Sequence, residues 1–328
     1  MFNKKMTLLY ILDILREYSD ENHLLTQQNI IDKLKAIYLI DIERKTISST
    51  IDLLIEYGYD IIKNPSGGYY LNERDFNENE IKYLIDALYS SKSIPGSEAR
   101  EISKKLYSKL SKYEQKDYSY LYKSTEVNRV ENKDVFLNIE LINEAIKQRK
   151  KITFEYLSYD ENGKLSTRRK GYKYKVSPYF LINNFNKYYL LCNIDRFDNH
   201  ANYRVEYMTN INILDEDIKP YKEVITLGEK FDITKHINDH IYMFGGKLIT
   251  AQIEILNKSA ITYVIDWFGN NARIYKDNDT IYAYIKSDDK AFFFWALQYQ
   301  EHIKVISPEE IVNKIVKTME ENLKKYRQ

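Results

Sequence analysis

Few residues in this 328-residue chain have the types and spacing that catalysis or metal binding requires. The single cysteine, Cys192, lies in the apolar run 188–192, where we expect a buried, unreactive thiol. His236 and His240 stand four residues apart, but no glutamate follows His236 and the sequence shows no third ligand. The sequence also has no phosphate-binding glycine loop. We therefore predict that the protein is not an enzyme and holds no metal or cofactor.

Basic and hydroxyl side chains gather instead at the start of a predicted helix over residues 43–57. Its apolar stripe of Ile47, Ile51 and Leu54 should face inward, which leaves the opposite side exposed. Such side chains can neutralise phosphates and bond base edges in double-stranded DNA. The alternative is a solvated face on an ordinary three-helix bundle. The candidate DNA contacts on this helix are Arg44, Lys45, Thr46, Ser48 and Ser49.

The elements around this helix predict a small DNA-binding domain over residues 1–74. Apolar spacing predicts two further helices, over 5–18 and 27–37, with Thr26 as N-cap of the second. Strands over 59–63 and 69–72 should form a hairpin, with Lys63 and Asn64 beside its glycine turn as further DNA contacts. Three helices and a hairpin outline a winged helix-turn-helix.

Charge within this domain favours a dimer. Residues 1–72 carry eight basic and ten acidic side chains, a net charge of −2, so a monomer should bind DNA weakly. Two domains would double the number of phosphate contacts, and we therefore predict a homodimer.

Helices should continue through residues 75–133, which we interpret as a helical connector. Asn77 and Glu80 form a capping box for a helix over 77–92, and a polar helix should cover 98–113. The charged stretch 114–133 has no regular apolar spacing and leads to a helix over 134–148.

From residue 151 to residue 210 the pattern changes to short strands separated by turns, which predicts a small antiparallel barrel. With the helix before it, this barrel makes up the predicted ligand-sensing domain, residues 134–216. Between residues 147 and 175 there are ten basic and three acidic side chains, with tyrosines interleaved. Cations beside aromatic faces suit a single-stranded nucleic acid or a nucleotide. The alternative is a solvated basic edge strand that guards against aggregation.

The last segment, 217–328, has the order strand, helix, two strands, helix, strand over 248–306, which is the ferredoxin-like βαββαβ pattern. A closing helix should begin at Ser307-Pro308-Glu309-Glu310, with Ser307 as its N-cap. The sequence has no membrane-length apolar run and no cleavable leader, so we expect a cytoplasmic protein with no membrane partner. The fold class predicted for the whole chain is multidomain α+β.

The order of these parts resembles the bacterial WYL-domain transcriptional regulators, which join a winged helix-turn-helix, a small Sm-like WYL barrel and a C-terminal WCX extension. Two positions depart from that pattern: Ser49-Thr50 stand where the family carries an Arg-Asp pair, and Tyr207 stands where the final WYL strand carries a second arginine. The matching segments are Arg44-Lys45-Thr46-Ile47 with Leu54 and Gly58 (recognition helix), Gly67-Gly68-Tyr69 (wing), 145–156 (leading helix and first WYL strand), Val176-Ser177-Pro178-Tyr179 (proline-bearing strand), Tyr188-Tyr189-Leu190 (the naming motif, with Tyr for Trp), 203–208 (final strand) and 307–310 (WCX ending).

The resemblance implies a ligand-responsive regulator of transcription. Its effector would be single-stranded nucleic acid or a nucleotide-like anion, bound by the WYL barrel, and its DNA partner a double-stranded operator. An alternative function is a nucleic-acid-processing enzyme, or its accessory subunit, in which the basic barrel grips single strands; another is an interaction scaffold without a nucleic-acid role. The effector contacts implied by the resemblance are Arg169, Ser177, Tyr179, Tyr189 and Arg204.

Overall fold

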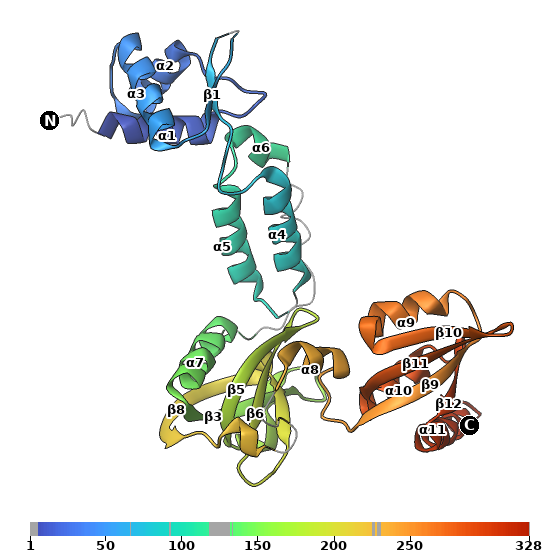
Figure 1. Cartoon of the computed structure of the whole chain (residues 1–328). Helices are drawn as coiled ribbons and strands as arrows, with labels where there is room; N and C mark the ends of the chain where they lie inside the picture. The colour runs from blue at the N-terminus through green and yellow to red at the C-terminus, as the bar shows by residue number, and fades with distance from the viewer. Residues whose placement is uncertain are drawn as a thin grey trace. The chain divides into compact units, whose positions relative to one another are not determined.

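The computed structural model describes residues 6–65, 67–91, 93–117, 132, 134–224, 227 and 231–327. The chain divides into two compact units, residues 1–131 and 132–328 (Figure 1). It is a mixed α and β protein of several parts, with helices in the first unit, then a curled antiparallel sheet and a second sheet in the second unit. Most of the predicted stretch 114–133 lies outside the described residues.

The first unit begins with three helices and a hairpin at the predicted places. The helices are α1 (Thr7–Tyr18), α2 (Gln27–Tyr38) and α3 (Arg44–Tyr57), and the hairpin strands are β1 (Ile61–Lys63) and β2 (Tyr69–Leu71). Thr26 caps α2 as expected, in a reciprocal pair with Asn29. A backbone bridge between Leu25 and Tyr69 attaches the hairpin to the start of α2. The apolar stripes of all three helices and the hairpin share one core.

Two more helices of this unit, α4 (Glu78–Ser90) and α5 (Gly96–Tyr107), lie side by side around a small apolar core (Figure 1). The predicted capping box of Asn77 and Glu80 is present at the start of α4. The helix expected over 98–113 is divided, because α5 ends at Tyr107 and α6 (Lys112–Asp117) starts separately.

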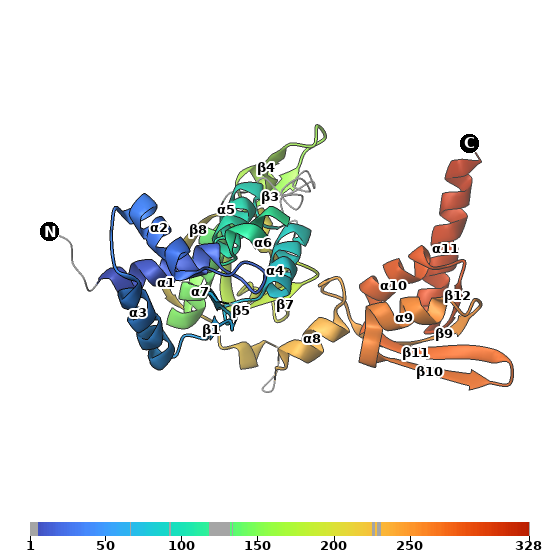
Figure 2. The same ribbon diagram turned by 90° about the horizontal axis from the view of Figure 1, so that it is seen from above.

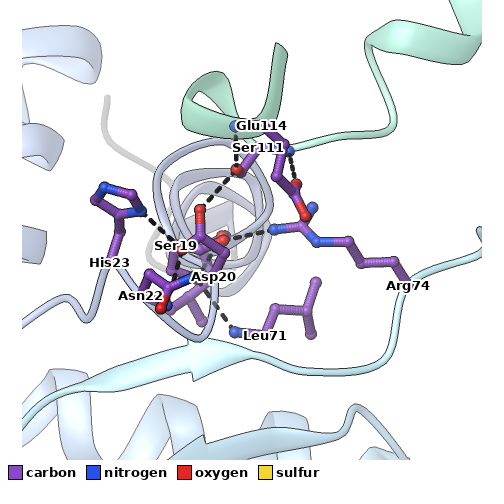
Figure 3. Close-up of polar contacts among 9 residues, drawn as sticks. Ser19, Asp20, Asn22, His23, Leu71, Arg74, Ser111 and Glu114 are labelled. Atoms are coloured by element: carbon purple, nitrogen blue, oxygen red, sulfur yellow. Dashed lines mark hydrogen bonds and ion pairs between the residues drawn. The ribbon is translucent and has the colours of Figure 1, made fainter. Parts of the chain in front are cut away.

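Asp20 joins the N-terminal helices to the segment around α6 (Figure 3). Its carboxylate accepts hydrogen bonds from the hydroxyl of Ser111 at 2.8 Å, from Nδ1 of His23 at 2.7 Å and from the backbone of Asn22 at 3.0 Å. Burial by itself raises the pKa of Asp20. The hydrogen bonds together lower the pKa by a larger amount, so the pKa of Asp20 lies below its ordinary value. Arg74 adds a hydrogen bond from its guanidinium to the carbonyl of Ser19.

This network predicts a clear loss of stability on substitution of Asp20. Asp20→Ala leaves the Ser111 and His23 groups without their acceptor, so we expect the free energy of unfolding to fall by about 1–3 kcal/mol. Denaturant unfolding followed by circular dichroism measures this change. Asp13→Ala is the control, because Asp13 is half exposed and makes only a 3.9 Å contact with Arg16. Equal stabilities of the two variants would contradict the role of Asp20.

The second unit starts with α7 (Val135–Gln148), which packs on a curled antiparallel sheet. The strand order in this sheet is β4-β3-β5-β6-β7, and β8 also pairs with β3. The last predicted strand is interrupted, since residues 205–207 form a 3-10 turn between β7 and β8. The strands are β3 (Lys150–Tyr159), β4 (Leu165–Thr167), β5 (Tyr174–Asn184), β6 (Lys187–Asn193), β7 (His200–Arg204) and β8 (Met208–Asp217).

Strand β6 supplies side chains to two different cores. Leu190 and Cys192 point into the interior of the curled sheet, beside Phe154. Tyr189 and Leu191 point the other way, into a second cluster that includes Met243. The Cys192 thiol is fully buried, and burial raises its pKa, so the expectation of an unreactive thiol is supported.

The chain then forms a second sheet with the strand order β10-β11-β9-β12, all neighbours antiparallel. Helices α9 and α10 cover one face of this sheet around the fully buried Trp295 (Figure 2). None of the described helices is both long and apolar enough to cross a membrane. The elements are α8 (Ile233–Asp239), β9 (Leu248–Ile255), α9 (Ala260–Phe268), β10 (Ala272–Asp277), β11 (Thr280–Asp288), α10 (Asp289–Gln298), β12 (Ile303–Ser307) and α11 (Glu309–Tyr326).

The predicted cap of the closing helix is wrong. Ser307 ends β12, where it pairs with Gln252, and Pro308 is the residue that caps α11. Pro308 has no side-chain donor or acceptor, so this helix start lacks the expected capping hydrogen bond.

Candidate functional site

The first half of α3 presents most of the predicted DNA contacts to solvent. Ile47, Ile51 and Leu54 are fully buried, as the apolar stripe predicts. Ser48 is only half-buried and its hydroxyl accepts a hydrogen bond from Gln27 at 2.6 Å, which ties α3 to α2. The exposed side chains are Arg44, Lys45, Thr46, Ser49 and, on the hairpin, Lys63.

The N-terminal end of α3 is arranged to attract an anion. Arg44 and Lys45 occupy the first turn, which has no acidic residue, and Glu43 makes no side-chain capping bond. A helix carries partial positive charge at this end, so two cations there cost about 0.3–1 kcal/mol each. A phosphate group would relieve that repulsion and satisfy free backbone N–H groups. Within the described parts of the chain, Arg44 donates only to the neutral amide of Gln28, at 3.0 Å, so its charge is not neutralised there.

An ion pair holds the hairpin against α3. The ammonium of Lys63 donates a hydrogen bond to the carboxylate of Asp52, and this bond raises the pKa of Lys63. Asn64 is half-buried, and its backbone closes the turn with Gly67 and Gly68. Lys63 therefore has an internal partner that the sequence did not reveal, whereas Lys45 makes no ion pair in the part of the chain that the structure describes.

The second unit brings together two of the five predicted effector contacts. Tyr189 and Arg204 are direct partners across β6 and β7. Both line a cavity of about 560 Å³, a size that suits a nucleotide or a small ligand. The other lining side chains, which the sequence did not single out for this purpose, are Tyr156, Phe185, Lys187, Asn202, Ile241, Tyr242, Met243, Phe244 and Trp267.

Arg204 is oriented by a buried carboxylate. Its Nε donates to Oε1 of Glu206 at 2.9 Å, and Glu206 is fully buried. Tyr207, the residue that departs from the family pattern, places its ring 4.5 Å from the Arg204 guanidinium carbon. The side chain of Arg204 stays 28% exposed, so it combines an internal ion pair with access to the cavity.

The other three predicted effector contacts lie elsewhere. Ser177 is fully buried and accepts a hydrogen bond from the backbone N–H of Lys219 at 3.0 Å. The hydroxyl of Tyr179 donates to the carbonyl of Lys219 at 2.7 Å, and burial raises the pKa of this tyrosine. Both side chains thus fasten the segment after β8. Arg169 is exposed in the turn after β4.

The basic excess predicted over 147–175 is partly neutralised in three dimensions. Lys150 pairs with Asp215 at 2.9 Å, and Lys175 pairs with Glu216 at 2.8 Å. Lys151 pairs with Asp195 at 2.7 Å. These acids lie outside the sequence window that gave the excess.

A smaller basic surface remains around the turn after β4. Tyr159 and Tyr172 are about half exposed beside it. We call this surface the basic tip. Its five cations are exposed, and none of them forms an ion pair within the described residues. They are Lys164, Arg168, Arg169, Lys170 and Lys173.

Three histidines form the group best suited to hold a metal ion. His200, His236 and His240 place one potential ligand atom each within 4.8 Å of the others. Burial, together with the smaller effect of the neighbouring His240, lowers the pKa of His200 to about 4 and that of His236 to about 3. The sequence pointed to His236 and His240 but missed His200, because thirty-six positions separate it from His236.

The buried carboxylate predicts how the pocket responds to substitution. Glu206→Gln removes the charge that orients Arg204, so we expect the free energy of unfolding to fall by about 1–3 kcal/mol. Asp215→Asn, at an exposed carboxylate that pairs with Lys150, should leave stability unchanged within error. Thermal and denaturant unfolding of both variants measure the difference. A loss of stability in Asp215→Asn without one in Glu206→Gln would contradict the role of Glu206 in orienting Arg204.

Similarity to a known protein family is found in the curled sheet. The WYL-domain family model matches residues 138–213, which cover most of α7 and of the curled sheet. No protein of curated function matches the sequence. Among solved structures, the chain is similar to the proteasome accessory factor B/C (PafBC) of Arthrobacter aurescens, with 14% identity and a TM-score of 0.30 over 94% of this chain, and it spans 47% of that chain. It is also similar to a CRISPR Cas-related protein, with 15% identity, a TM-score of 0.39 and coverage of 95% of this chain and 97% of that one. The match of the family model to the curled sheet shows that this part of the chain is a WYL domain.

Proposed function

We propose that this protein is a non-enzymatic, ligand-responsive transcriptional regulator that binds operator DNA as a homodimer. In this proposal residues 7–71 act as a winged helix-turn-helix, the WYL domain binds a nucleic acid or a nucleotide-like anion, and the C-terminal sheet is a ferredoxin-like WCX extension. The observation that carries the DNA-binding role is the exposed pair Arg44 and Lys45 at the acid-free first turn of α3.

Three features of the first unit support DNA binding by α3. The helix exposes cations and hydroxyls on one side while its other side is fully buried, so it can enter a groove without unfolding. The hairpin packs beside it through the shared apolar core, and Lys63 of the hairpin contacts Asp52 of the helix. The domain's net negative charge makes a single copy a weak DNA ligand, which favours two copies on a two-fold symmetric operator.

The pocket of the second unit supports a ligand with a phosphate and an aromatic base. Arg204 supplies a guanidinium that is already oriented by Glu206, and a bidentate phosphate contact requires such orientation. The rings of Tyr156, Trp267 and Phe244 in the lining offer stacking surfaces. From the base of the basic tip, Tyr159 contacts Tyr207 at a ring distance of 6.2 Å, and Tyr207 contacts Arg204. A single strand could follow this path of aromatic and cationic groups.

Selection of fragments bound by the full chain from the source genome would test the proposed function. We expect a symmetric sequence with two half-sites separated by a whole number of helical turns. Enrichment of no sequence at low salt would exclude a DNA-binding regulator. Incubation of the protein with labelled single- and double-stranded DNA and Mg²⁺ should leave both intact, and a cleaved product would instead support a processing enzyme.

Lys45 should contribute one phosphate contact. We expect Lys45→Ala to weaken operator binding and to reduce the slope of log affinity against log salt concentration by about 0.9. Fluorescence anisotropy at several salt concentrations measures both. Lys105→Ala is the control, because Lys105 is an exposed lysine on α5 of the same unit. Equal slopes for Lys45→Ala and the unmodified protein would remove Lys45 from the interface.

Arg204 should hold the phosphate of the ligand, but a single substitution would leave Glu206 charged and buried. We therefore expect the paired variant Arg204→Met with Glu206→Gln to fold and to bind a labelled single-stranded oligonucleotide about 10- to 100-fold more weakly. The control pair, Lys175→Met with Glu216→Gln, removes an exposed ion pair of the same unit and should bind normally. Normal binding by the first pair, measured at equilibrium, would overturn the pocket assignment.

A further inference from the structure

Three histidines that are far apart in the sequence meet next to the pocket that contains Arg204. His200 begins β7, His236 lies on α8 and His240 directly follows α8. One nitrogen from each imidazole lies within 4.8 Å of the other two. Within the described parts of the chain, no other three His, Cys, Asp or Glu side chains are placed in this way. His236 and His240 are buried, and His200 is half-buried.

The rings pack tightly enough to share a centre. The imidazoles of His236 and His240 stack with their centroids 4.2 Å apart. His200 meets both edge-on, at centroid distances of 5.0 Å and 5.9 Å. A cluster of this kind needs a reason, because each imidazole carries a nitrogen lone pair that should be satisfied when it is buried.

Hydrogen bonding indicates which nitrogens are available as ligands. The carbonyl oxygen of His236 can only accept, so Nδ1 of His240, 3.0 Å away, is the donor. The lone pair of His240 is therefore on Nε2. A ligating histidine commonly donates its other ring N–H to a backbone carbonyl in this way. Nε2 of His236 is buried and has no hydrogen-bond partner among the described residues, so it is a polar atom that an ion would satisfy.

The chemistry of the donors selects the kind of ion. Imidazole nitrogen suits zinc and its neighbours among the transition metals, whereas Mg²⁺ and Ca²⁺ require oxygen ligands. Zinc–nitrogen bonds of about 2.0–2.1 Å in a tetrahedron place the ligand nitrogens roughly 3.4 Å apart. The observed spread of up to 4.8 Å is wider by about 1.4 Å, which small rotations of the rings can close.

We propose that His200, His236 and His240 bind one divalent transition-metal ion, with Zn²⁺ as the expected occupant. Three protein ligands leave a fourth position for water or for a ligand group. This proposal does not depend on DNA binding or on the identity of the effector.

The ion would connect the two walls of the Arg204 pocket. Alternate side chains of a strand share a face, so His200 lies on the same face of β7 as Asn202 and Arg204, which line the pocket. His240 directly precedes Ile241, Met243 and Phe244 of the opposite wall. A hydrogen bond from the Asn202 amide to the Met243 carbonyl, at 3.1 Å, already joins these walls. A metal bound to both β7 and the end of α8 would hold them at a fixed separation.

Metal binding to the full chain, free of any histidine tag and stripped with a chelator, tests the proposal. Titration with Co²⁺ should produce the visible absorption bands of a four- or five-coordinate ion at a stoichiometry of about one per chain, and Zn²⁺ should displace them. Equilibrium dialysis with elemental analysis should retain about one Zn²⁺ per chain, and Mg²⁺ should not compete. Absence of bands together with no retained Zn²⁺ would overturn the site and would show the histidines to be core packing only. Competition by Mg²⁺ would also contradict an imidazole site.

Matched variants locate the ion. Loss of a residue that only hydrogen-bonds a ligating histidine weakens metal affinity roughly 10- to 100-fold. We expect a larger loss of Zn²⁺ affinity, and no cobalt bands, in each of the variants His200→Gln, His236→Gln and His240→Gln. His302→Gln makes the same substitution at a histidine after α10 and should bind normally. Loss of binding in His302→Gln, or normal binding in all three cluster variants, would place the ion elsewhere. Addition of Zn²⁺ should raise the unfolding temperature of the unmodified protein and of His302→Gln.

Discussion

The register between β6 and β7 is the constraint on which the functional surfaces of the second unit depend. It pairs Tyr189 with Arg204 and Asn193 with His200, so one face of β7 presents His200, Asn202 and Arg204 together. A slip of one residue would turn all three toward the other face and send Tyr203 outward in their place. The register is well specified, because Tyr203 packs with the core of the curled sheet while Tyr189 and Leu191 fill a second cluster. Burial on both sides of β6 therefore positions the pocket and the histidine cluster at once.

Arg204 shows how a buried charge can prepare a binding group. The Glu206 carboxylate is fully buried, and its ion pair with Arg204 offsets part of the cost of that burial. The same contact fixes the guanidinium in one orientation, and the ring of Tyr207 covers it. Tyr207 thus helps to hold the Arg204 guanidinium in place by packing against it. An incoming phosphate would meet a cation whose side-chain entropy is already reduced.

Much of the secondary structure could be predicted from local patterns. The N-cap at Thr26, the capping box at Asn77 and the apolar spacing of α3 are contained in a few consecutive residues, and the structure agrees with each of them. The cap predicted at Ser307 failed because the residue was needed to end β12, and pairing to a neighbouring strand is not a local property. The basic excess over 147–175 was overestimated for a similar reason, as Asp215 and Glu216 come from a strand that follows forty residues later.

By itself the sequence determined the order of elements, the exposed cations of α3, the burial of Cys192 and the likeness to WYL-domain proteins. These features depend on periodicity, capping and short motifs, which extend over one or two helical turns or a single strand. Only the tertiary structure decided which side chains meet. It joined Arg204 to Tyr189 beside a cavity, gave Ser177 and Tyr179 internal partners at Lys219, and brought His200 to His236 and His240. The physical reason is that these encounters depend on strand pairing and on packing between segments distant in the chain, and neither leaves a signature in the local spacing of residues.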